Sequence, residues 1–311
     1  MRRAAALLLA LVSAGCVQGT ASFPGSGDST HAADTRIKND NNANSNENHL
    51  NHTNHSPGDA SHAKFAAPEN HRGPAPLAGA PFIELDVPNH GPAVVSVPLG
   101  ATSRRPVLVA AHGAGDRPEW QCHVWRGIVG DRAFVLCPRG FPTNPYVPPD
   151  HTGYFYTTHH ALGREIALAF EALAERFPDY VDREKPVFAG FSQGAIMGAL
   201  LLPHHSVRFA RAALVEGGYG FFQEWNIHAA QTWARQGGVR ALLACGRLRC
   251  AEQAALTAYY MKRGGLAARV LYAEGAGHSY GGRMEIALRE AFAWLAEGDP
   301  RFADETPKSS P

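Results

Sequence analysis

The sequence carries almost no excess charge of either sign, because 29 lysines and arginines are balanced by 28 aspartates and glutamates. A protein that binds nucleic acid presents a clear positive excess, so this balance argues against a polyanionic partner. Long apolar runs are also missing. The longest, residues 4–12, is too short to cross a bilayer as a helix. Apolar residues nevertheless make up 45% of the 311 residues, which is enough for one sizeable core.

Residues 1–16 have the pattern of an export signal. Arg2 and Arg3 provide a positive start, and the apolar run follows them. The segment ends in Ser-Ala-Gly-Cys, which resembles a bacterial lipobox, in which the cysteine is lipidated and becomes the new N-terminus. This pattern predicts a chain anchored to the cell envelope through a lipid on Cys16. The alternative is a plain secretory signal cleaved nearby, and both place the protein outside the cytoplasm.

Cysteine is scarce, with five residues in the chain, and no pair has the Cys-x-x-Cys spacing of common zinc sites. The sequence therefore gives poor support for a zinc site. Without Cys16 four cysteines remain, an even number that is expected to pair in an oxidising compartment. Closeness in sequence and in the expected fold favours Cys122–Cys137 and Cys245–Cys250, and four buried free thiols are the alternative. The second bridge would close a short loop and contribute little stability.

Residues 17–78 contain hardly an apolar cluster and are rich in asparagine, histidine, serine and glycine. Such a segment cannot bury enough surface to offset the entropy lost on ordering, so we predict a disordered tether. Its histidines could bind a metal loosely, but no cysteine or carboxylate pattern completes a ligand set, and a polar surface tether is the preferred interpretation. The histidines considered are His49, His52, His55, His62 and His71.

Residues 79–298 change to a regular alternation of strand and helix patterns, and residues 299–311 are predicted to be a disordered tail. Two strands around the turn at residues 88–91 begin the domain, and buried strands then alternate with amphipathic helices. This order predicts an α/β fold with a mostly parallel eight-stranded sheet and helices on both faces. The expected strands are 82–87, 93–99, 105–113, 132–140, 185–191, 209–218, 239–246 and 267–275. The expected helices are 157–177, 193–202, 226–236, 251–265 and 283–298.

A Gly-Phe-Ser-Gln-Gly sequence stands between the strand that ends at residue 191 and the helix that follows. This strand–Gly-x-Ser-x-Gly–helix context is the nucleophile elbow, in which a strained turn exposes the serine hydroxyl. Larger side chains in place of Gly190 and Gly194 would collide with neighbouring backbone. Ser192 is therefore a candidate nucleophile, and the alternative is an ordinary turn residue. A serine hydroxyl needs a base, and His278, in the glycine-rich loop after the last strand, can reach it across the sheet edge.

The segments His112–Asp116, "CPRGFP" and "GFSQGA" resemble those of α/β-hydrolases of the carboxylesterase and acyl-protein thioesterase branch. The resemblance covers residues 82–297. It implies that Ser192 is the nucleophile, that His278 is the base, and that the backbone N–H groups of Ala114 and Gln193 form the oxyanion hole. His112 is expected to orient its loop rather than to act in catalysis, and Asp116 to cap or orient the same loop.

The acid of the triad departs from this pattern. The esterase branch usually carries an aspartate in Gly-x-x-Asp after the strand that reads "ALLACG", and Arg249 occupies that position here. We propose Glu216, at the end of the strand before it, as the replacement. Gly217 and Gly218 would let this carboxylate turn towards His278. The alternatives are Glu252, Glu274 or no working acid.

The residues together predict an exported serine esterase that cleaves carboxylic esters through an acyl-enzyme and uses no cofactor and no metal. A peptidase or thioesterase on the same fold, and an inactive surface lipoprotein with a binding role, are the alternatives. The expected partner is a small-molecule or polymer ester. The sequence determines neither the identity of this ester nor the oligomeric state. Aromatic residues near the site could line a pocket or simply cover the core: Tyr154, Phe155, Tyr156, Tyr219, Phe221, Phe222 and Trp225.

Overall fold

The computed structural model describes residues 73–220 and 224–303. The predicted signal, the lipobox cysteine Cys16, and the tether up to residue 72 lie outside these residues, as do residues 304–311 of the predicted tail. Among the helices that the structure describes, none is both long enough and apolar enough to span a membrane.

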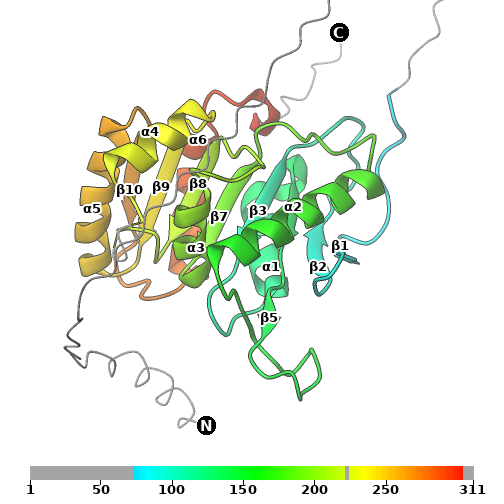
Figure 1. The fold of residues 1–311 in the computed structure, drawn as a ribbon. Coiled ribbons are helices and arrows are strands. Elements are labelled where there is room, and N and C mark those ends of the chain that lie inside the picture. The colour runs from blue at the N-terminus through cyan, green and yellow to red at the C-terminus, as the bar shows by residue number, and fades with distance from the viewer. Residues whose placement is uncertain (1–72, 221–223, 304–311) are drawn as a thin grey trace, which may run out of the picture. The chain divides into compact units, whose positions relative to one another are not determined.

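Eight strands form one sheet in the order β1-β2-β4-β3-β7-β8-β9-β10 (Figure 1). β2 runs antiparallel to both β1 and β4. The last six strands in this order, β4, β3, β7, β8, β9 and β10, are parallel to one another. The prediction of a mostly parallel eight-stranded sheet is confirmed. The strands are β1 (Phe82–Leu85), β2 (Ala93–Ser96), β3 (Val107–Ala111), β4 (Phe134–Cys137), β7 (Val187–Phe191), β8 (Arg211–Val215), β9 (Arg240–Cys245) and β10 (Ala267–Tyr272).

Helices cover both faces of the sheet, and the side chains of each strand alternate between two cores. In β3, Val107 and Val109 belong to one core, whereas Leu108 and Ala110 belong to the other. The first core includes buried residues of α2 (His159–Arg176), α3 (Gln193–Leu201), α4 (Ile227–Arg235) and α5 (Leu248–Arg263). The second core includes those of α1 (Pro118–Val129) and α6 (Arg283–Ala296). Because both faces are buried, the central strands read as nearly continuous apolar runs rather than alternating, and the one charged residue of β3, β7 and β8 is Arg211 at the start of β8.

The sequence analysis missed a helix and a short hairpin. α1 lies between β3 and β4, and it buries Cys122, Trp125 and Ile128 at helical spacing. A short hairpin of β5 (Phe141–Pro142) and β6 (Tyr154–Phe155) precedes α2 and lies outside the main sheet.

The domain is larger than predicted at both ends. Leu77, assigned to the tether, is buried, and its backbone N–H donates to Ala101 O at 2.9 Å. Residues 299–303, assigned to the disordered tail, form a short 3₁₀ helix at Pro300–Phe302. Phe302 is buried there, and the Asp299 carboxylate pairs with the buried Arg211 guanidinium at 3.2 Å. These contacts make residues 299–303 part of the packed domain.

Both predicted disulfides are present. Cys122–Cys137 joins α1 to β4, and Cys245–Cys250 joins the end of β9 to the first turn of α5. The first bridge spans 15 positions and connects two buried elements, whereas the second spans five positions. The second bridge also lies beside the candidate site.

Candidate active site

Ser192 occupies the sharp turn between β7 and α3, at φ 49° and ψ −114°. A positive φ is unusual for a residue with a side chain and is typical of a strained functional turn. A Cβ on Gly190 would come within 2.7 Å of the Ala195 nitrogen, and one on Gly194 within 2.4 Å of the Ala111 carbonyl oxygen. These approaches to backbone explain why the serine is flanked by glycines, and they place the start of α3 directly against β3.

His278 follows β10 in the glycine-rich loop, and the structure brings it to Ser192. Its Nε2 lies 3.0 Å from the Ser192 Oγ, and its ring packs against Phe191 with the centroids 5.0 Å apart. The imidazole is partly exposed, with 43% of its side-chain surface accessible. A molecule in solvent can therefore reach the contact between the hydroxyl and the ring.

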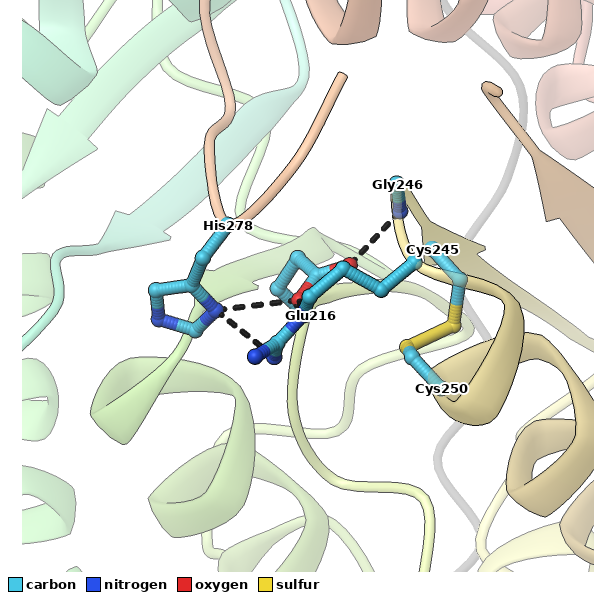
Figure 2. Close-up of a disulfide and its surroundings, with 6 residues drawn as sticks. Glu216, Cys245, Gly246, Cys250 and His278 are labelled. Atoms are coloured by element: carbon cyan, nitrogen blue, oxygen red, sulfur yellow. Dashed lines mark hydrogen bonds and ion pairs between the residues drawn. A yellow bond between two sulfur atoms is a disulfide. The ribbon is translucent and has the colours of Figure 1, made fainter. Parts of the chain in front are cut away.

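Glu216 is the carboxylate that contacts the imidazole. It follows the last residue of β8 at a positive φ of 52°, and its side chain is fully buried. The Oε2 atom lies 3.0 Å from His278 Nδ1, and Oε1 accepts the Gly246 N–H at 2.6 Å (Figure 2). If Nδ1 carries the ring proton and donates it to Glu216, Nε2 is free to accept the proton of Ser192. This is the tautomer that a general base needs.

Glycines after Glu216 allow its strand to approach the elbow. A Cβ on Gly217 would lie 2.5 Å from the Ser192 carbonyl oxygen, and one on Gly218 would lie 2.6 Å from the Ala195 carbonyl oxygen. Glu252 and Glu274, the two alternatives for the acid, are exposed, as is Arg249.

Electrostatics keep the Glu216 carboxylate ionised. Burial raises its pKa, but hydrogen bonds from His278, Gly246 and Arg247, together with the charge of Arg247, outweigh burial and leave the pKa below its ordinary value. Arg247 donates from Nε to Oε2 at 2.8 Å, and its Nη2 lies 2.5 Å from the same oxygen. This arginine was missed by the sequence analysis, which considered the acid position two residues later.

The loop after β3 packs against the elbow. A Cβ on Gly113 would lie 2.9 Å from the Phe191 ring and 3.3 Å from the Ser192 Cβ, so only glycine allows this approach. Ala114 follows it and is exposed. Gln193 is the first residue of α3, where backbone N–H groups have no acceptor within the helix. Of the two predicted donors, Gln193 therefore directly follows the serine, and Ala114 follows the glycine that approaches it.

His112 is buried behind this loop, and its ring nitrogens lie 2.8 Å from the carbonyl oxygens of Gly113 and Arg139. Burial lowers the pKa of His112 despite these contacts. The His112 backbone N–H donates to the Tyr156 hydroxyl at 3.2 Å, and the two rings stack. The Gln193 side chain pairs in both directions with the Tyr156 backbone, at 2.9 and 3.1 Å. Tyr156 therefore links the loop after β3 to the start of α3.

Asp116 and Tyr280 link the loop after β3 to the histidine loop. The Tyr280 hydroxyl donates to the Asp116 carboxylate at 3.1 Å, and the same carboxylate oxygen accepts the Arg117 N–H at 2.8 Å. Of the aromatic residues considered for a pocket, Tyr154, Tyr156 and Trp225 are buried. Phe221 and Phe222 lie outside the described residues.

One group of described side chains has the donor set for a metal ion. Ligand atoms of Glu216, Cys245 and Cys250 lie within 4.8 Å of one another. The two sulfurs are joined in the disulfide, however, and the carboxylate already accepts hydrogen bonds from three residues. While the bridge is intact, this group therefore does not fit a metal ion.

No protein-family model matches the sequence, and no curated protein matches it. Solved structures do resemble the fold. The Thermus thermophilus protein TT1662 aligns with a TM-score of 0.50 and 17% identity over 70% of this chain and 98% of its own. An uncharacterized protein from Bacillus cereus ATCC 10987 aligns with a TM-score of 0.50 and 13% identity, over 63% of this chain and 62% of its own.

A Bacillus cereus carboxylesterase aligns with a TM-score of 0.46 and 18% identity, over 65% of this chain and 93% of its own. At identities this low, a similarity in structure is evidence about the fold and not about the activity. The sheet order and the elbow described above, together with the alignment to TT1662, agree with the α/β-hydrolase fold that the sequence resemblance implied.

Proposed function

We propose that the protein is a serine hydrolase that cleaves carboxylic esters through an acyl-enzyme. One observation carries the proposal: a continuous series of contacts joins Ser192 Oγ, the His278 ring and the Glu216 carboxylate, with 3.0 Å at each step. A nucleophile, a base and a buried acid in this order are the parts that activate a serine hydroxyl. The same geometry on another fold performs acyl transfer, so the proposal depends on these residues rather than on the fold.

In the proposed mechanism, the Ser192 Oγ attacks the ester carbonyl while His278 Nε2 takes the hydroxyl proton. Ionised Glu216 holds the Nδ1 proton and stabilises the imidazolium that forms. The backbone N–H groups of Ala114 and Gln193 bind the oxygen of the tetrahedral intermediate, and the loss of one such donor typically costs about 2.7–4 kcal/mol of barrier. His278 then protonates the departing alcohol, and a water molecule that it activates releases the acid.

We further propose that this reaction takes place outside the cytoplasm, with the protein anchored through Cys16 or secreted. The signal pattern of residues 1–16 supports this location. The two disulfides add support, because such bridges persist in oxidising compartments. Incorporation of a fatty acid into the wild-type chain, lost in Cys16→Ala, would support the anchor, whereas an unlipidated chain in the culture medium would favour plain secretion.

Matched chromogenic substrates test the reaction. Wild-type protein and Ser192→Ala are compared on p-nitrophenyl acetate, p-nitrophenyl butyrate, an acyl p-nitroanilide and a thioester of the same acyl chain. We expect ester turnover by the wild type and loss of at least about 10³-fold in Ser192→Ala. Faster turnover of the amide than of the esters would instead favour the peptidase alternative, and faster turnover of the thioester than of the esters would favour the thioesterase alternative. Equal rates for both proteins on every substrate would favour a binding role.

A further inference from the structure

The turn between Cys245 and Cys250 contacts both oxygens of the candidate acid. We call residues 245–250 the cysteine-closed turn. Gly246 on this turn donates its backbone N–H to Glu216 Oε1, and Arg247 donates from its side chain to Oε2. His278 provides the remaining contact to Oε2. Two of the three residues that hold the carboxylate therefore come from one short turn.

The same turn also contacts the histidine loop. The Gly277 N–H donates to the Gly246 carbonyl at 3.3 Å, and a Cβ on Gly246 would lie 2.2 Å from the Gly277 carbonyl oxygen. Gly277 immediately precedes His278. The turn therefore contacts both members of the acid–base pair. Gly246 binds the Glu216 carboxylate, and it also contacts the backbone of Gly277, which precedes His278.

Core packing holds the two ends of the turn but not its middle. Residues 247–249 are exposed, and only Cys245, Gly246 and Cys250 are buried. The disulfide joins the two buried ends, and both sulfurs lie within 4.8 Å of a Glu216 carboxylate oxygen (Figure 2). A covalent bridge across a turn with exposed residues limits the conformations that the turn can adopt.

Arg247 also restricts how the acid meets the base. Its Nη2 lies 3.0 Å from His278 Nδ1 as well as beside Glu216 Oε2. A guanidinium can only donate and each carboxylate oxygen has two lone pairs, so Oε2 can accept from Arg247 and from a protonated Nδ1 together. Oε1 is fixed by Gly246, and Oε2 is therefore held at the point where the imidazole reaches it.

We propose that the cysteine-closed turn positions the acid of the triad: the Cys245–Cys250 bridge fixes the turn, and Gly246 and Arg247 hold the Glu216 carboxylate towards His278. Arg247 is a positioning residue, because it acts on the reacting atoms only through Glu216. The inference rests on the proposed ester hydrolysis, since it explains how the acid of that reaction is held.

The two disulfides of this chain provide a matched pair for the test. Cys245→Ala/Cys250→Ala and Cys122→Ala/Cys137→Ala are compared with the wild type for kcat and KM on p-nitrophenyl butyrate and for Tm. Alanine removes both sulfurs, so no thiol remains to bind metal beside Glu216. We expect the first double variant to lose about 10- to 100-fold in kcat with KM within about twofold, as for a catalytic group displaced by about 1 Å. The second is expected to keep kcat and to lose more in Tm.

A second pair of variants tests the turn without touching the bridge. Arg247→Gln is expected to lower kcat about tenfold, and Arg247→Lys, which keeps the charge, should recover part of the loss. Arg249→Gln, exposed on the same turn, is the control and should behave as wild type. The downfield proton resonance of His278 Nδ1–H should weaken or shift in Arg247→Gln and not in Arg249→Gln.

Unchanged kcat in both Cys245→Ala/Cys250→Ala and Arg247→Gln, in an enzyme whose activity depends on Ser192, would overturn the inference and leave the proposed function intact. Loss of kcat to the same degree in both double cysteine variants would also overturn it, because the effect would then be one of general stability. If the wild type shows no turnover that depends on Ser192, the proposed function itself fails.

Discussion

Replacing Glu216 with glutamine is the sharpest test of the assigned acid, because it keeps the shape of the side chain and removes its charge. With His278 in the tautomer that a general base needs, both carboxylate oxygens face donors only: the Gly246 N–H on one side, and Arg247 and His278 on the other. The amide nitrogen of Glu216→Gln is itself a donor, and it must face one of these two sets.

Either orientation of the amide damages the site. If the nitrogen faces Gly246, two N–H groups oppose each other in a buried place, which costs about 1–3 kcal/mol. If it faces His278, the ring accepts at Nδ1 and carries its proton on Nε2, where it cannot take the proton of Ser192. The corresponding change from acid to amide in a serine protease lowers kcat by about 10⁴-fold. We expect a loss of about 10³- to 10⁴-fold here, or about 4–5.5 kcal/mol of barrier.

The assay measures kcat and kcat/KM on p-nitrophenyl butyrate for Glu216→Gln, Glu252→Gln and Glu274→Gln, with circular dichroism to confirm folding. The last two replace exposed carboxylates and should stay within about twofold of wild type. A folded Glu216→Gln that retains more than a tenth of the wild-type kcat would refute the assignment. So would a Glu252→Gln or Glu274→Gln variant that loses as much.

We make three further predictions, on the packing of the elbow, on the pH dependence of stability and on the C-terminal end of the domain. Gly194→Ala should abolish turnover and lower Tm, because its Cβ would meet the backbone of β3, whereas Gly281→Ala, with open space around it, should do neither. The pKa of Glu216 is lower in the folded state than in the unfolded state, so its ionisation stabilises the fold at neutral pH. This stabilisation decreases when the pH drops below about 4.3, the pKa of an unfolded glutamate. The gap in unfolding free energy between wild type and Glu216→Gln should therefore narrow below that pH in urea titrations. Truncation after residue 298 should cost about 3–5 kcal/mol, because Arg211 loses its buried partner Asp299, whereas truncation after residue 303 should cost little.

Much of the fold and part of the site follow from local sequence. A central parallel strand is buried on both faces, so β3, β7 and β8 read as short apolar runs between turn residues. Ser192 is recognisable because the elbow needs its glycines at fixed positions. His278 follows from its place after the last strand, since loops at the carboxyl ends of parallel strands share one edge.

Other features depend on contacts between distant segments. Arg247 and Glu216 are 31 positions apart and meet only because β8 and β9 are neighbours in the sheet. The expected Gly-x-x-Asp pattern has its acid position at Arg249 and does not identify Arg247. The end of the domain was placed too early because Phe302 is a single large apolar residue in a polar segment. In the structure Phe302 packs against Phe292, and Asp299 pairs with Arg211.

α1 was missed because its amphipathic pattern is mixed. Pro118 opens the helix, Gly127 lies within it, and the exposed Trp120 interrupts the amphipathic pattern. Its buried positions are specified by packing against β4 and α6 and by the Cys122–Cys137 bridge, none of which is visible along a single segment.

The role of Ser192 as the nucleophile is tested most directly by the mass and position of a fluorophosphonate adduct on the folded protein. We predict one adduct per chain, mapped by peptide sequencing to Ser192, with labelling abolished in Ser192→Ala and strongly slowed in His278→Ala. A folded wild-type protein that takes up no adduct, or takes it up at another residue, would show that Ser192 is not an activated nucleophile.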